Sequence, residues 1–168
     1  ASANRGKKSI TLDLAREEGR ALLKELVATA DVLVENFKVG TLARMGLDPA
    51  SLRADNPHLI LCSITGYGQT GPYAARGGYD PVIQGLCGLM SVTGYPPEQP
   101  GGGPMKTGPS LVDIVTGLYA VIAIQAALIE RGNDGPGTDL DLSLLDCGVA
   151  VMAPHTLAAV SFAARCKP

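Results

Sequence analysis

One carboxylate stands alone in the longest apolar segment of the chain. Within residues 108–128 Asp113 is the only charged residue, and no other charge occurs between Lys106 and Glu130. A helix that is apolar on nearly every face is buried, either in a protein core or in a bilayer. A carboxylate there must be capped, paired or used, because an isolated buried charge is unfavourable. Asp113 is therefore the first candidate for chemistry.

Two roles for Asp113 are consistent with its spacing. Ser110 followed by Asp113 fits a capping box ahead of an apolar run, and an acid in the first turn meets the positive end of the helix dipole. The alternative role is that of a nucleophile, since the helix N-terminus keeps the carboxylate ionised while apolar walls solvate it poorly. The spacing favours the structural cap, and the rest of the chain must decide.

Composition narrows the classes of function. The chain has 168 residues, of which 46% are hydrophobic and 18% charged, so it can bury a core as one domain or part of one. A net charge of -2, with scattered Lys and Arg and no series of aromatic residues, argues against a nucleic-acid partner. The four cysteines lie far apart without a CxxC pair, and we expect buried, reduced thiols of a cytoplasmic protein at Cys62, Cys87, Cys147 and Cys166.

Metal and membrane sites are not expected. His58 and His155 have no acid or thiol at ligand spacing, so both are interpreted as structural and no metal site is predicted. Residues 111–129 have the length of a membrane span, but Asp113 and Gln125 lie inside the segment and no basic asymmetry flanks it. We therefore predict a buried core helix and no membrane contact.

The patterns along the chain alternate between strand and helix. Strands are predicted at residues 9–14, 31–35, 58–64 and 138–143. Helices are predicted at 16–30, 41–45, 49–54, 81–92, 108–128 and 144–164, the last with a kink at Pro154. This alternation indicates an α/β fold in which a parallel sheet carries helices on its faces.

In such a sheet the ligand crevice lies beyond the carboxyl ends of the strands. The segments 36–45 and 65–80 each follow a predicted strand and are therefore the candidate site. The loop at 65–72 is rich in glycine, but it matches neither a Walker A motif nor the GxGxxG spacing. A nucleotide site of either type is rejected.

These segments, taken together, resemble the class III coenzyme A transferases, the CaiB/BaiF or formyl-CoA transferase group. The motifs run in the same order from Asn4 to about Ala153, and each is weak alone although the set is specific. They are residues 4–10 (NRGKKSI), 31–37 (DVLVENF), 40–46 (GTLARMG), 62–72 (CSITGYGQTGP), 78–80 (GYD) and the helix that carries Asp113.

The resemblance implies an architecture larger than this chain. Its fold would be a Rossmann-like parallel sheet with flanking helices, an incomplete part of an interlocked homodimer. Residues 1–150 would form the central part of the large CoA-transferase domain, and residues 151–168 a helix leading out toward a small domain. Because family members are much longer, we expect a fragment that is inactive alone and associates through exposed apolar faces.

The resemblance also implies that Asp113 is the nucleophile, against the preference for a cap. Asp113 would attack an acyl-CoA thioester to give an aspartyl–acyl anhydride, and the thiolate would then form an aspartyl–CoA thioester. A second carboxylic acid would take over the CoA. The partners are then an acyl-CoA and a carboxylic acid, with coenzyme A as the transferred group and no metal.

The family's binding residues carry over by position. The CoA groove would be lined by Leu12, Asn36, Phe37, Arg44 and Met45. Arg44 would contact a phosphate, a charge-assisted role suited to guanidinium.

The acyl group would lie near Tyr79 and Asp80, where formyl-CoA transferase has a tyrosine and a glutamate. The α-methylacyl-CoA racemases share the fold and the acid, but they carry a Gly-His-Asp triplet where this chain has residues 78–80 as Gly-Tyr-Asp. Because racemisation needs two bases, a transferase is favoured. A non-catalytic CoA-binding module in which Asp113 only caps its helix is the third hypothesis. The run at 67–72 suggests a dicarboxylate or acyl-carboxylate substrate over a formyl one.

Overall fold

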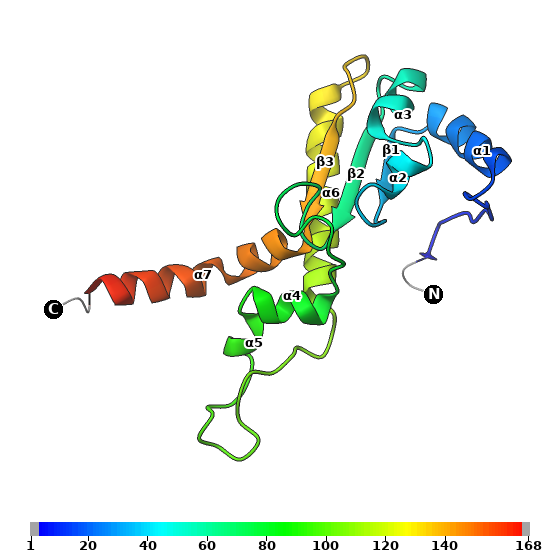
Figure 1. The fold of residues 1–168 in the computed structure, drawn as a ribbon. Coiled ribbons are helices and arrows are strands. Elements are labelled where there is room, and N and C mark those ends of the chain that lie inside the picture. The colour runs from blue at the N-terminus through cyan, green and yellow to red at the C-terminus, as the bar shows by residue number, and fades with distance from the viewer. Residues whose placement is uncertain (1–3, 166–168) are drawn as a thin grey trace.

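The computed structural model describes residues 4–165, with side chains described as far as Ser161. Cys166 lies outside the described residues. The elements, in chain order, are α1 (Glu17–Ala28), β1 (Val32–Glu35), α2 (Thr41–Arg44), α3 (Pro49–Asp55), β2 (Ile60–Thr65), α4 (Asp80–Leu86), α5 (Leu89–Val92), α6 (Leu111–Arg131), β3 (Asp139–Ser143) and α7 (Leu144–Arg165) (Figure 1).

The three strands form a parallel sheet in the order β1-β2-β3. Cys62 in the central strand pairs with Val34 on one side and with Leu140 on the other. Ile60, Leu61 and Cys62 are almost completely buried, as expected for a strand covered on both faces. The α/β prediction of a parallel sheet with flanking helices is confirmed.

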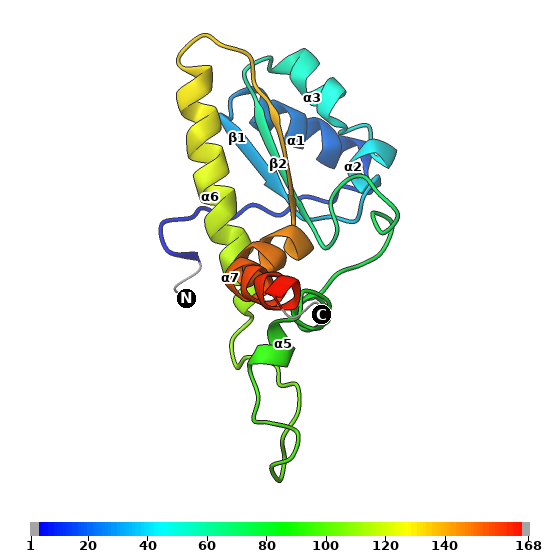
Figure 2. The ribbon, with the colours of Figure 1, turned by 90° about the vertical axis from the view of Figure 1, so that its left-hand side faces the viewer.

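Helices cover both faces of the sheet. Figure 2 shows α6 on one side of the strands and α1 and α3 on the other. On the α6 side, Ala120 packs against Cys62 and Leu142. On the opposite side, Val27, Leu47, Leu52 and Leu59 form the core between α1, α3 and the sheet. The sheet therefore holds α6, and with it Asp113, in a fixed position.

Local chemistry explains where the short helices begin and end. Asp48 caps α3, since its Oδ1 accepts a hydrogen bond from the backbone N–H of Ser51 at 3.1 Å. Gly46 has a φ of 68°, the left-handed conformation that closes a helix, and the N–H of Leu47 reaches back to the carbonyl of Leu42 at 2.9 Å. Gly46 thus follows Met45, the C-cap residue of α2, and terminates the helix.

Two predicted elements were wrong in extent or type. Residues 9–14 alternate like a strand, but they form no strand in the structure, and Ile10 is 65% exposed. Alternation gives a strand only where a neighbouring backbone pairs with it, and no partner for this segment lies in residues 4–165. The predicted helix at 81–92 is divided into α4 and α5 at Gly88, whose φ of 86° interrupts helical geometry.

The expectation that α6 is buried all round was also wrong. Its buried residues, Val112, Thr116, Ala120 and Ala127, form one face. Ile114, Leu118 and Ile122 are each more than half exposed on the other. By length and composition α6 and residues 144–161 of α7 could each cross a membrane, a test that core helices of soluble proteins also pass.

Two of the three cysteines in the described residues are buried, as the sequence predicts. Cys62 and Cys147 are buried and Cys87 is half-buried, and all three are free thiols. Desolvation raises the pKa of the Cys62 thiol, so this cysteine remains protonated and unreactive.

Candidate active site

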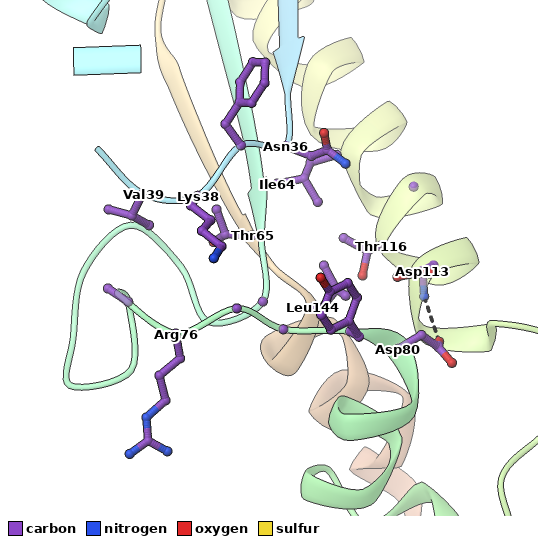
Figure 3. Close-up of a pocket in the computed structure, with 17 residues that line it drawn as sticks. Asn36, Lys38, Val39, Ile64, Thr65, Arg76, Asp80, Asp113, Thr116 and Leu144 are labelled. Atoms are coloured by element: carbon purple, nitrogen blue, oxygen red, sulfur yellow. Dashed lines mark hydrogen bonds between the residues drawn. The ribbon is translucent and has the colours of Figure 1, made fainter. Parts of the chain in front are cut away.

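A cavity of about 440 Å³ opens at the carboxyl ends of the three strands. Asn36 and Phe37 follow β1, Thr65 ends β2, and Leu144 follows β3. The remaining walls come from residues 74–80 and from the first two turns of α6. Figure 3 shows Asp113 and Thr116 of α6 facing this space from the side opposite Lys38. A cavity thus lies at the strand ends, where the sequence predicts the ligand crevice, and ligand binding there stays a prediction.

Asp80 caps the helix that carries Asp113. Its Oδ1 accepts hydrogen bonds from the backbone N–H groups of Val112, at 2.8 Å, and Asp113, at 3.2 Å (Figure 3). These are first-turn N–H groups, which have no partner inside the helix. Within the described residues Ser110 is the N-cap residue but its side chain makes no capping bond. The predicted capping box was therefore wrong, because a carboxylate from α4 occupies the donors that Ser110 would serve.

A buried amide fixes the Asp80 carboxylate. Gln84, one turn later in α4, is 0% exposed and donates from Nε2 to Oδ2 of Asp80 at 2.6 Å. Its Oε1 accepts from the backbone N–H and the hydroxyl of Thr107, at 3.0 and 3.1 Å. Gln84 thus links α4 to the segment that leads into α6. Both the nitrogen and the oxygen of its side-chain amide have hydrogen-bond partners.

Asp113 has a raised pKa. The first cause is desolvation and the second is the negative charge of Asp80 nearby. Asp113 is exposed in the described chain and lines the cavity. Both causes make the ionised form less stable and therefore more reactive as a nucleophile.

The glycine-rich loop after β2 is held against the sheet. The N–H of Gly68 donates to Oγ1 of Thr65, and the N–H of Gln69 donates to Oδ2 of Asp141 on β3, each at 2.9 Å. Gly66 and Gly78 pack closely, since a Cβ added at Gly66 would lie 2.5 Å from the Cα of Gly78. This packing brings the segment before Tyr79 onto the floor of the cavity.

Comparison with known proteins identifies the family. The family model for CoA-transferase family III matches residues 1–167. The chain belongs to CoA-transferase family III. It is 55% identical over 156 residues to a succinate–glutarate CoA-transferase of Agrobacterium fabrum, covering 93% of this chain and 38% of that protein. It is 45% identical over 152 residues to a human succinyl-CoA:glutarate CoA-transferase, covering 90% of this chain and 34% of that protein.

A solved structure supports the same assignment. The crystal structure of a CaiB/BaiF family protein from Brucella suis matches with a TM-score of 0.87 and 52% sequence identity. The match covers 93% of this chain and 40% of that one. The chain thus spans between about a third and two fifths of the proteins it matches, and the activity of a whole family III protein is a proposal for it.

The structure brings together five of the eight residues that the resemblance marked. Asp113, Asn36, Phe37, Tyr79 and Asp80 all line the cavity of this family III chain. The other three lie outside the described cavity lining. Leu12 is half-buried ahead of α1, and Met45 packs against the core between α1 and α3. Arg44 is exposed on α2, where it donates to Oγ1 of Thr41 at 2.9 Å. Their contacts with CoA stay predictions.

Two cations of the cavity lie inside the predicted segments 36–45 and 65–80 but were not singled out as site residues. Lys38 and Arg76 are the cations in the described lining, and Figure 3 shows the Arg76 side chain pointing away from Asp113. Arg76 instead lies over the Tyr73 ring, 4.1 Å from its centre. Lys38 could have been found from its position just after a predicted strand, and Gln84 from its spacing of four residues after Asp80. No metal-binding group of three or more His, Cys, Asp or Glu occurs in the described part of the chain.

Proposed function

We propose that this chain carries the nucleophile of a CoA-transferase that moves CoA from an acyl-CoA to a carboxylic acid. The observation that carries the proposal is the placement of Asp113. Asp113 lies in the first turn of α6, whose N-terminus is capped by Asp80. It also lines the cavity at the strand ends. Its raised pKa adds support, because a poorly stabilised carboxylate is a better nucleophile.

The first half of the reaction forms two covalent intermediates. The Asp113 carboxylate attacks the thioester carbonyl; a C–O bond forms, the C–S bond breaks, and CoA leaves as a thiolate with the electron pair. The thiolate then attacks the aspartyl carbonyl of the anhydride, which releases the first carboxylate and leaves Asp113 bound to CoA as a thioester. No proton is transferred in either step, so no general base is required.

The second half repeats these steps in reverse with the acceptor. The acceptor carboxylate attacks the aspartyl–CoA thioester, and the released thiolate attacks the acyl carbonyl of the new anhydride. The product acyl-CoA leaves and the Asp113 carboxylate is regenerated. Asp80 takes no part in these steps. Both its carboxylate oxygens accept hydrogen bonds, from Val112, Asp113 and Gln84, which supports a positioning role rather than a direct bond to substrate.

We propose that CoA extends from the cavity toward α2. A second cavity of about 270 Å³ adjoins the first at Lys38 and Val39 and is lined further by Leu42 and Ala43 of α2. Arg44 follows directly on that helix. Phe37 and Lys38 then lie along the path of the thioester arm, and Arg44 at its charged end.

The relatives' names support dicarboxylic acids as the substrates. Both relatives described above are named for transfer involving succinate or succinyl-CoA and glutarate. A racemase is less well supported, because neither described histidine lines the cavity and His58 is occupied by the Gly135 carbonyl at 2.7 Å.

Mass spectrometry on the full-length protein that carries this chain tests the proposal. The protein is incubated with acetyl-, succinyl- or glutaryl-CoA, trapped with hydroxylamine or borohydride, and digested. The expected result is a modification on the peptide that contains Asp113, absent in Asp113→Asn. If CoA thioesters bind but Asp113 is never modified, the transferase proposal fails and a binding module is favoured. If the substrate α-proton exchanges without CoA transfer, a racemase is favoured instead.

A further inference from the structure

Gly117 lies one helical turn after Asp113 on α6, and both residues line the same cavity. Residues four apart share a helix face, so the two belong to one strip of α6. That strip runs beside the face that packs on the sheet, which carries Val112 and Thr116. A glycine inside a helix is less stable than an alanine, and this helix is 21 residues long. The glycine therefore needs a reason.

Neither usual reason for glycine applies at position 117. Its φ is not among the positive values of this chain, so it does not need the left-handed conformation. A Cβ added there would meet no atom of the described chain within 4 Å, so close packing does not need it either. Gly148 in α7 shows the contrast, because a Cβ there would lie 3.0 Å from the Sγ of Cys87.

The direction in which side chains leave a helix shows which space stays open when residue 117 has no Cβ. Each Cα–Cβ bond in a helix tilts toward the N-terminus, so a residue covers the turn before its own Cα. A side chain at position 117 would therefore lean over the turn that carries Asp113. Because both residues line the same cavity, the open space at Gly117 belongs to the cavity that Asp113 also lines.

We propose that Gly117 is a specificity-determining residue, which leaves room beside Asp113 for the acyl group and sets the acyl size that the site accepts. The inference rests on the proposed role of Asp113 as nucleophile. For attack, the thioester carbonyl carbon must come within about 3–3.5 Å of a carboxylate oxygen. Substituents on the neighbouring acyl carbons then lie against the strip of α6 that Gly117 opens.

The discriminated ligands are acyl groups that are long or branched near the thioester. An acetyl group places only a methyl group beside the carbonyl and can be accommodated with a small side chain at 117. A succinyl, glutaryl or α-branched acyl group places more atoms there. The space at Gly117 therefore matters more as the acyl group grows.

Steady-state kinetics of the full-length protein tests this with a graded set of donors: acetyl-, succinyl-, glutaryl- and isobutyryl-CoA. The variants are Gly117→Ala and Gly117→Val, with Gly148→Ala as a matched helical glycine away from the cavity. We expect kcat/KM of the Gly117 variants to fall least for acetyl-CoA. For the larger or branched donors that the wild type uses, it should fall about 10-fold to 100-fold, the range that one misplaced methyl group causes in a pocket.

Thermal melting separates this effect from misfolding. Gly117→Ala should melt no lower than wild type, because alanine favours the helix and meets no neighbour. Gly148→Ala should melt lower because of the contact with Cys87, and its losses should not depend on acyl size. Equal loss across all donors in Gly117→Ala, or a fall in its melting temperature, would overturn the inference.

A binding series keeps this test independent of the proposed function. Thioether analogues of the same CoA esters are titrated calorimetrically into wild type and the Gly117 variants. If the wild type turns over no donor, the proposed function fails, yet an affinity loss that grows with acyl size still supports the role of Gly117. If each Gly117 variant binds every analogue as tightly as the wild type does, the proposed role of Gly117 is overturned.

Discussion

The carboxylate of Asp80 accepts a hydrogen bond from the backbone N–H of Asp113 at 3.2 Å, and its charge adds to desolvation in raising the pKa of the Asp113 side chain. One buried acid thus fixes the position of a second acid and opposes its ionisation. Asp80 is 3% exposed, so water does not screen it directly. The reactivity proposed for Asp113 depends on this pair, as the following predictions test.

The cap of α6 should depend on Asp80 and not on Ser110. We expect Ser110→Ala to change the free energy of unfolding by less than about 0.5 kcal/mol, although loss of a true N-cap typically costs about 1 kcal/mol. Asp80→Ala leaves three donors without their acceptor and should cost at least about 2 kcal/mol. Denaturant unfolding of the full-length protein measures both, and a larger loss in Ser110→Ala than in Asp80→Ala would contradict the assignment.

Moving the buried negative charge from position 80 to position 84, one helical turn later, should change the pH profile of kcat/KM. In Asp80→Asn a donor of the new amide faces the Nε2 donor of Gln84, which should destabilise the protein by about 1–3 kcal/mol. Adding Gln84→Glu restores an acceptor toward both position 80 and Thr107, so the double variant should be more stable than the single one.

The activity of that double variant reports on Asp113. With the negative charge moved away from position 80, the pKa of Asp113 should fall. The acid limb of kcat/KM should therefore shift to lower pH, since the nucleophile must be ionised. An unshifted acid limb in an active double variant would show that Asp80 does not influence Asp113 electrostatically.

The Asp113→Asn variant should become more stable relative to wild type as the pH rises. The folded-state pKa of Asp113 is raised above its ordinary value of 3.8, so the native protein binds more protons than the unfolded chain in the interval above 3.8. Wild-type stability is lost as pH rises through the folded pKa, and the asparagine removes this loss. The melting temperature of Asp113→Asn minus that of wild type should be larger at pH 7 than at pH 4, and an opposite trend would mean that the pKa is lowered.

The isolated 168-residue chain should associate. Leu118, Ile122 and Ile129 are 60%, 60% and 83% exposed along α6, which forms an apolar strip. Light scattering should give a mass above the 17.3 kDa of one chain. Lysines at positions 118 and 122 should reduce the association, whereas Glu98→Lys in the exposed loop should leave it unchanged. A monomeric wild-type chain would contradict the prediction.

The sequence predicts the parts of the site whose signals are local. Asp113 is conspicuous because its helix holds no other charge, and the strand ends at Asn36 and Thr65 follow from hydrophobic runs that stop at polar residues. The family resemblance added Tyr79, which no periodicity indicates.

The parts that failed depend on contacts between distant segments. The capping box was predicted from Ser110 because it lies three residues before Asp113, but the donors are taken by Asp80, which lies 33 residues earlier. Residues 9–14 have strand periodicity without a strand partner in the described chain. The exposed face of α6 is equally apolar in sequence to its buried face, so composition could not distinguish them. The assignment of residues 1–150 to the central part of the large domain, and of residues 151–168 to a helix leading toward a small domain, stays a prediction.

The parallel order of the strands also decides when the site can form during synthesis. Its walls come from segments at residues 36–39, 64–66, 74–80, 113–117 and 144, and β3 pairs with β2 only after the long α6 has been made. A nascent chain that ends within α6 thus carries Asp113 without the strand that completes the sheet. Because a protein chain emerges N-terminal end first, the Asp113 carboxylate gains the surroundings that these segments supply only as Leu144 emerges.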